Sequence, residues 1–127
     1  MELYRAGEDY LKAILILQRK NKSVHAVDIA RMLRVKKPSV SRAIKQLREG
    51  GFLTTDEENR IFLTDTGRET AEQIYEKYRI LSAWLTALGV DIDTAEKDAC
   101  RMEHIVSPET LERLKIAAGI ENIERKY

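Results

Sequence analysis

The sequence from Pro38 to Gly51, PSVSRAIKQLREGG, predicts one helix with a clear start and a clear end. Proline suits the first turn of a helix, because its missing N–H would have no partner there anyway. Val40, Ile44 and Leu47 recur at helical spacing and would face a core, and two consecutive glycines end the pattern. The neighbouring elements can be placed relative to this helix.

Two helices are expected before this segment and a hairpin after it. Apolar side chains recur at helical spacing over about residues 7–19 and 27–33. Two short apolar runs, 52–55 and 60–64, flank the polar tip Asp56-Glu57-Glu58-Asn59 and predict a β-hairpin. This order predicts a winged helix-turn-helix, in which the Pro38 helix would enter the major groove of DNA.

The second half of the chain predicts helices only. A long helix over about residues 65–88 would connect the halves. Two more would follow, one that Asp91 or Asp93 caps and that runs through His104, and one that begins at Ser107.

The expected fold class is therefore mainly α with a small β-hairpin. A winged helix-turn-helix DNA-binding domain would occupy residues 1–70, and an all-α dimerisation and metal-binding domain would occupy residues 71–127. The tail, residues 120–127, has a mixed composition and is expected to be partly ordered.

Charge is unevenly distributed along the chain, although the formal net charge is only +1. Residues 1–64 carry 13 basic and 8 acidic side chains, whereas residues 65–127 carry 9 and 13. Seven basic residues and no acidic residue lie between Arg31 and Arg48, a local density that suits a polyanion such as DNA. The alternative is a basic face that is only solvated.

The predicted DNA contacts divide into two classes. Those expected to meet phosphates are Lys36, Lys37, Arg42, Lys45 and Arg48, with Arg31 in the same basic band and Arg60 on the hairpin. Those expected to read bases are Pro38, Ser39, Ser41 and Gln46, although Gln46 equally fits a solvent-facing position. The acidic hairpin tip would face phosphates unfavourably, so Arg60 is the one hairpin residue expected to reach the DNA backbone.

A second group of chemically distinctive residues lies at Cys100-Arg101-Met102-Glu103-His104. On a helix, its thiol, carboxylate and imidazole fall within an arc of about 100°. Carboxylates suit Mn(II), imidazole suits Fe, Ni and Zn, and a thiolate favours softer ions, so the donors indicate a transition metal without naming it. The alternative is a buried cysteine beside a surface Glu–His pair.

Taken in order, these segments resemble the diphtheria-toxin-repressor and manganese-transport-regulator family of metal-dependent transcriptional regulators. The matching segments are Glu8-Asp9-Tyr10-Leu11, Ile29-Ala30, Pro38-Ser39-Val40-Ser41, Leu63-Thr64-Asp65-Thr66-Gly67 and Asp98-Ala99-Cys100-Arg101-Met102-Glu103-His104. The resemblance runs nearly end to end. It implies a homodimeric repressor of metal-uptake genes that Mn(II) or Fe(II) activates.

The resemblance also implies which residues hold the metal. The matching ligand positions are Asp9, Cys100, Glu103 and His104. The family's ancillary site does not carry over, because its positions fall on Tyr78, Ser82 and Lys12. We therefore expect one divalent ion per protomer. Mn(II) or Fe(II) is favoured by the family, and Zn(II), Co(II) or Ni(II) competes because of the thiolate.

The resemblance further implies a mechanism and two partners. An ion bound by both halves of the chain would tie them together, and a dimer would hold two Pro38 helices roughly 34 Å apart on a palindromic operator in double-stranded DNA. The apolar residues expected at the dimer interface are Ile80, Leu81, Trp84, Leu85 and Leu88. The alternative is that Trp84 packs only within its own chain.

Two other functions compete with this interpretation. One is a DNA-binding regulator with a degenerate metal site, either metal-independent or redox-sensing through Cys100, the only cysteine. The other is a metallohydrolase, which the sequence disfavours because it lacks a His-Glu-x-x-His pattern, a nucleophile elbow and a phosphate loop. We expect no enzyme activity.

The sequence also predicts a location. It has no apolar run long enough to span a membrane, and residues 1–5 lack the layout of a signal peptide. We therefore expect a cytoplasmic protein without a membrane partner.

Overall fold

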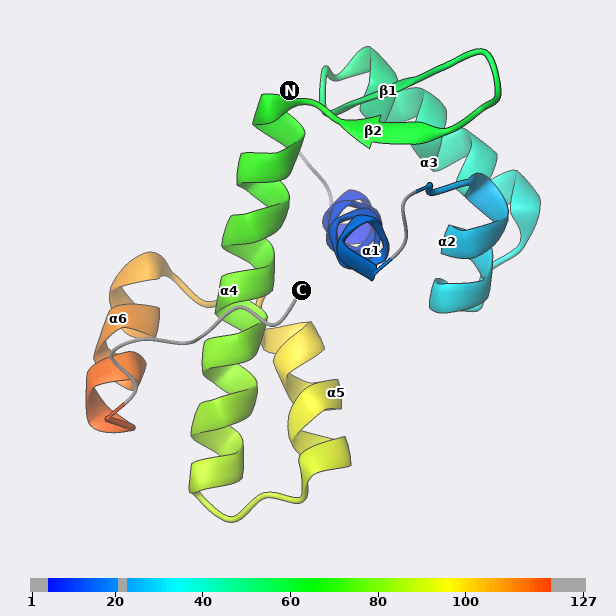
Figure 1. Ribbon diagram of the computed structural model, residues 1–127. Coiled ribbons are helices and arrows are strands. Elements are labelled where there is room, and N and C mark those ends of the chain that lie inside the picture. The colour runs from blue at the N-terminus through cyan, green and yellow to red at the C-terminus, as the bar shows by residue number, and fades with distance from the viewer. Residues whose placement is uncertain (1–4, 21–22, 120–127) are drawn as a thin grey trace. The chain divides into compact units, whose positions relative to one another are not determined.

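The computed structural model describes residues 5–20 and 23–119 (Figure 1). These residues divide into two compact units after Glu72, two residues beyond the predicted boundary. The predicted tail, residues 120–127, lies outside the described residues. The fold is mainly helical with one two-stranded antiparallel hairpin, which confirms the predicted fold class.

The first unit is a winged helix-turn-helix (Figure 1). Its elements are α1 (Arg5–Lys20), α2 (Ala26–Leu33), α3 (Lys37–Glu49), β1 (Leu53–Thr55), β2 (Ile61–Leu63) and the first turns of α4 (Asp65–Ala87). The bounds of the three complete helices and of both strands lie within two residues of the predicted ranges. Helix α1 packs against α2, α3 and β2, so it forms the centre of this unit.

The core of the first unit consists of the apolar faces that the helical spacing predicted. Val40, Ile44 and Leu47 of α3 are buried, as expected. In helix α2, Ile29 is fully buried whereas Ala30 and Leu33 are only half-buried. The largest fully buried side chains of this unit are Leu11, Ile14, Val24, Ile29, Val40, Leu53 and Ile61.

A tight turn joins α2 to α3. Arg34 adopts the left-handed conformation, with φ 56° and ψ 47°, and the Val35 N–H donates to the Ala30 carbonyl at 3.1 Å. Lys36 is extended and precedes the helix, which begins at Lys37, one residue earlier than predicted. Pro38 therefore still lies in the first turn, where the absence of its N–H costs nothing.

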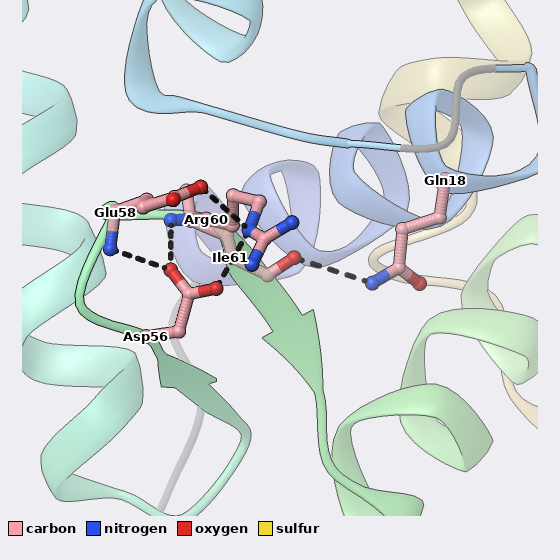
Figure 2. A network of polar contacts seen from close by, with 5 residues as sticks. All are labelled: Gln18, Asp56, Glu58, Arg60 and Ile61. Carbon is pink, nitrogen blue, oxygen red and sulfur yellow. Dashed lines mark hydrogen bonds and ion pairs between the residues drawn. The ribbon is translucent and has the colours of Figure 1, made fainter.

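The hairpin of residues 52–64, called the wing below, pairs Leu53 with Leu63, Thr54 with Phe62 and Thr55 with Ile61. Ile61 joins the wing to the rest of the unit through both of its backbone polar groups. Its N–H donates to the Val24 carbonyl at 2.8 Å, and its carbonyl accepts from the Gln18 side chain of α1 at 3.5 Å (Figure 2). Leu53, Ile61 and Leu63 are buried, so one face of the wing belongs to the core.

Helix α4 begins in direct contact with the start of the wing. The Thr64 hydroxyl accepts from the Gly67 N–H at 3.0 Å, which caps the helix, and donates to the Gly51 carbonyl at 2.7 Å. Gly67 lies so close to Phe52 that an added Cβ would stand 1.8 Å from the Phe52 carbonyl oxygen. At the other end of this unit, Arg19 of α1 forms an ion pair with Glu72 of α4 at 2.9 Å.

The second unit contains the remainder of α4, α5 (Ile92–Met102) and α6 (Pro108–Ala117). The Asp91 carboxylate accepts from the Asp93 N–H at 3.2 Å and caps α5, and the Ser107 hydroxyl accepts from the Thr110 N–H at 3.1 Å and caps α6. A groove of about 390 Å³ lies between α4 and α6.

The prediction that α5 runs through His104 is wrong by two residues. The helix ends at Met102, and Glu103 keeps right-handed helical angles just beyond it. The His104 N–H donates to the Arg101 carbonyl and the Ile105 N–H to the Met102 carbonyl. These bonds reach back three residues instead of four, so the last turn is tighter than an α-helix.

We expect the replacement Gly67→Ala to destabilise the first unit. Alanine favours a helix over glycine by about 1 kcal/mol, but the added methyl group would overlap a backbone oxygen, and overpacking costs about 1–3 kcal/mol or more. The clash therefore outweighs the helix propensity. Urea unfolding followed by circular dichroism should show a lower free energy of unfolding.

The control is Glu69→Ala, an exposed position in the same turn of α4. This replacement should change the free energy of unfolding by less than about 0.5 kcal/mol. A Gly67→Ala variant more stable than the wild type would contradict the close approach to Phe52.

Candidate metal centre and nucleic-acid interface

Two metal-binding side chain types are buried side by side at the end of α5. The Glu103 side chain is 0% exposed and the His104 side chain 3% exposed, and the His104 Nε2 lies 3.5 Å from a Glu103 carboxylate oxygen. A carboxylate buried so deeply is stable only when it is paired or coordinates a metal. The pair therefore combines donor types that transition metals accept.

The other two predicted ligands are Cys100 and Asp9. Cys100 is half-buried in the last turn of α5, one turn before Glu103, and its thiol is free of any disulfide. Asp9 is half-buried on α1 in the first unit. The structure thus places three of the four predicted ligands at the end of one helix of the second unit, and the fourth in the other unit.

The positions that match the family's ancillary site carry side chains of a different chemistry. Tyr78 of α4 stacks on Tyr75, with ring centroids 6.0 Å apart and planes at 16°. Burial raises the pKa of the Tyr78 hydroxyl above its ordinary value, and the nearby negative charge of Glu96 raises it further. The Ser82 hydroxyl donates to the Arg79 carbonyl at 3.3 Å, and Lys12 is buried on α1. Neutral hydroxyls and an ammonium group are poor metal ligands, because ligands must give up their protons.

Helix α3 presents its predicted DNA contacts on the face opposite the core. The residues exposed there are Lys36, Lys37, Pro38, Ser39, Ser41, Arg42, Lys45, Gln46 and Arg48. Arg31 of α2 is exposed as well. The separation between this polar face and the buried Val40, Ile44 and Leu47 leaves the whole basic band accessible to a DNA groove.

One contact of this band was not predicted from the sequence. The Arg48 guanidinium donates to the Thr55 hydroxyl of β1 at 3.1 Å, so the last basic residue of α3 fixes the wing beside it. Arg48 lies at the end of α3 and Thr55 in β1, so no single helical or strand periodicity relates the two residues. No pattern in the sequence could therefore have indicated this contact.

Arg60 has a different environment from the one expected. Instead of facing solvent alone, its Nε donates to the Asp56 carboxylate at 2.6 Å and lies 3.6 Å from the Glu58 carboxylate (Figure 2). The turn brings these groups together, because Asn59 adopts the left-handed conformation at φ 61°. Two acidic side chains of the wing therefore already bind Arg60, and its contact with a DNA phosphate stays a prediction.

The same contacts change the ionisation of both partners. Burial alone would raise the pKa of Asp56, but hydrogen bonds from the backbone and guanidinium of Arg60 and from the Glu58 N–H outweigh it and lower that pKa. The hydrogen bond to Asp56, together with its negative charge, raises the pKa of Arg60. Both groups therefore stay charged over the whole physiological range of pH.

The residues expected at a dimer interface differ in their exposure. Ile80 and Leu81 are buried within the single chain, so they are less available to a second copy than the sequence suggested. Trp84 and Leu85 are half-buried, and Leu88 is 64% exposed just beyond the end of α4. The apolar surface open to a partner is therefore narrower than predicted.

Among the described residues, no helix is long and apolar enough to cross a membrane.

Two protein-family models match almost the entire chain. Residues 2–59 match the N-terminal DNA-binding domain of iron-dependent repressors. Residues 64–119 match the metal-binding and dimerisation domain of iron-dependent repressors. The gap between the two matches falls within the wing.

Known proteins resemble the chain over most of its length. An uncharacterized HTH-type transcriptional regulator of Methanocaldococcus jannaschii is 36% identical over 111 residues, which cover 86% of this chain and 89% of the relative. The transcriptional regulator MntR of Escherichia coli is 34% identical over 109 residues, which cover 86% of this chain and 70% of MntR.

A solved structure of the manganese regulator SloR has a similar fold. It matches with a TM-score of 0.81 and 29% identity, over 94% of this chain. This chain spans only 55% of the SloR chain.

We expect the Asp56 carboxyl to titrate below the usual aspartate pKa of about 3.9. A lowered folded-state pKa means that Asp56 stabilises the wing above about pH 4, and that this stabilisation is lost as the pH falls through the lowered value. NMR titration of the side-chain carboxyl carbon measures it directly. In Arg60→Gln the pKa should rise but stay low, because the backbone N–H donors remain.

The control for this titration is Arg48→Gln, which removes another wing contact without touching Asp56. An Asp56 pKa unchanged by Arg60→Gln would refute the ion pair.

Proposed function

The chain belongs to the family of metal-dependent transcriptional regulators that includes MntR and the diphtheria toxin repressor, and from this premise we propose that it is a homodimeric repressor of metal-uptake genes activated by Mn(II) or Fe(II). The observation that carries the proposal is the buried pair of Glu103 and His104. The family consists of transcriptional regulators, and we propose no catalytic role.

The proposed metal ligands are Asp9, Cys100, Glu103 and His104. The donor set fits a divalent transition metal, since it offers carboxylate, imidazole and thiolate groups. The solved structures similar to this chain include the manganese regulator SloR, which favours Mn(II), and the Cys100 thiolate keeps Zn(II), Co(II) and Ni(II) as competitors. We propose one ion per protomer, because the ancillary positions carry Tyr78, Ser82 and Lys12.

The proposed partner is double-stranded DNA in the cytoplasm. Lysine and arginine side chains of α3 would contact phosphates, while Pro38, Ser39, Ser41 and Gln46 would face base edges. A dimer presents two copies of α3, so the operator would be palindromic, with half-sites roughly 34 Å apart. Binding would weaken steeply with salt, because phosphate contacts release counterions.

Metal would act on DNA binding through coupling between two sites. If Asp9 joins the ligands of α5, the ion links the DNA-binding unit to the second unit. Such couplings typically change affinity by about 5- to 150-fold. The ion supplies only this link and a positive charge, whereas the DNA contacts come from the side chains of α3.

The test is anaerobic fluorescence anisotropy on a duplex from the promoter of the chain's own gene. Mn(II) or Fe(II) should tighten binding by about 5- to 150-fold over a chelator-treated sample. His104→Ala should abolish this response, because it removes the buried imidazole. Elemental analysis should find one ion per chain in the wild type.

The matched control is His25→Ala, which replaces the other histidine of the chain. Its ring is 42% exposed at the start of α2, so the variant should keep the metal response. Tight DNA binding that chelator does not change would instead favour the metal-independent alternative. In that case the effect of peroxide on the wild type and on Cys100→Ser would test a redox sensor.

We also expect the protein to be a dimer in solution. Light scattering after size-exclusion chromatography should give twice the 14.6 kDa chain mass. Leu88→Glu, which places a charge on the most exposed of the proposed interface residues, should weaken the dimer by about tenfold or more. Val27→Glu, at a 44% exposed apolar position on α2, is the control and should leave the mass unchanged. A wild-type monomer at micromolar concentration would rule out the two-half-site arrangement.

A further inference from the structure

We propose that Asp56 competes with DNA phosphates for Arg60, so that the wing adds an attractive contact to DNA only where the Asp56–Arg60 ion pair opens. Asp56 would thereby lower affinity for DNA in general and increase discrimination in favour of sites where the wing fits the backbone closely. This inference rests on the proposed DNA-binding function. It assigns a specificity role to a residue that the family resemblance leaves unmarked.

The geometry of the wing tip engages Asp56 through both carboxylate oxygens (Figure 2). Its Oδ1 accepts from the Glu58 N–H at 3.0 Å and from the Arg60 N–H at 2.9 Å. Its Oδ2 accepts from the Arg60 Nε at 2.6 Å. One carboxylate therefore both shapes the turn and binds the guanidinium.

The net charge of the wing tip determines how the Asp56–Arg60 ion pair would affect DNA binding. Arg60 is the only basic residue of the wing, and Asp56, Glu57 and Glu58 are all acidic. With Arg60 paired, the tip carries a net charge of −2 and no cation directed at a phosphate. An unadapted duplex would therefore meet repulsion from the wing instead of attraction.

Solvent exposure allows a DNA phosphate to compete with Asp56 for Arg60. The side chains of Arg60, Asp56 and Glu58 are 41%, 28% and 74% exposed, so a phosphate can approach the guanidinium from solvent. Exposed ion pairs contribute only about 0–1 kcal/mol, so a phosphate of the DNA backbone can displace the Asp56 carboxylate. Small differences in how closely the DNA backbone approaches would therefore decide which anion binds Arg60.

The body of the wing is held independently of this pair. The Ile61 N–H bonds the Val24 carbonyl, and the Arg48 guanidinium bonds the Thr55 hydroxyl. The Thr64 hydroxyl bonds the Gly51 carbonyl behind the wing. Opening the Asp56–Arg60 pair therefore frees the arginine without disturbing the strand register.

The test uses Asp56→Asn in the full-length protein. Asparagine keeps an oxygen acceptor for the two turn N–H groups but loses the negative charge that binds Arg60. Affinity for a random-sequence duplex, measured by anisotropy with Mn(II) present, should rise about two- to fivefold. The salt dependence should steepen by about 0.9 in log–log slope for each protomer that gains a phosphate contact.

Two further variants separate release of Arg60 from simple loss of negative charge. In an Arg60→Gln background, Asp56→Asn should no longer steepen the salt dependence, and most of the affinity gain should disappear. Glu58→Gln removes the same charge from the looser partner at 3.6 Å, so its gain should be smaller. Amide NMR signals of the wing, unchanged in each variant, would establish that the hairpin stays folded.

The outcomes separate this inference from the proposed function. Wild-type DNA binding is measured first, and its absence in the presence of metal would overturn both. If the wild type binds DNA, the proposed function survives whatever the wing variants do. If Asp56→Asn raises the affinity for DNA equally with and without Arg60, or does not raise it, the inference is overturned and the proposed function is not.

Discussion

Gly67 lies against the Phe52 backbone so closely that any side chain there would collide with a carbonyl oxygen, and the winged helix depends on this contact. Thr64 strengthens the same junction, because its hydroxyl bonds both the Gly51 carbonyl and the Gly67 N–H. The end of α3, the start of the wing and the first turn of α4 therefore meet at one point. Their close approach orients α3 and the wing with respect to each other.

Positive charge within the first unit is concentrated on the exposed face of α3. Its exposed face carries the basic band, and its opposite face supplies Val40, Ile44 and Leu47 to the core. The wing, by contrast, neutralises its one cation with its own acids. A chain with a formal net charge of only +1 thus has one strongly basic surface beside an acidic one.

At the end of α5 the chemistry of the proposed metal site depends on burial. Glu103 and His104 are adjacent in the sequence, and both side chains lie out of solvent, 3.5 Å apart, in the tightened turn that follows the helix. Their donor types were readable from the residues, as was the substitution of hydroxyl groups at Tyr78 and Ser82. The extent of α5 was predicted two residues too long, because hydrogen bonds that reach back three residues leave no mark on apolar spacing.

The helices, the hairpin and their order followed from local pattern, since apolar periodicity, N-cap residues and glycine pairs act over a few neighbouring positions. The exposed basic face of α3 followed for the same reason. The partner of Arg60, the bond from Arg48 to Thr55 and the burial of Ile80 and Leu81 depended on how the chain packs. Whether a side chain meets solvent, an acid or an apolar neighbour is set by residues that only folding brings near it, and no local spacing encodes that choice.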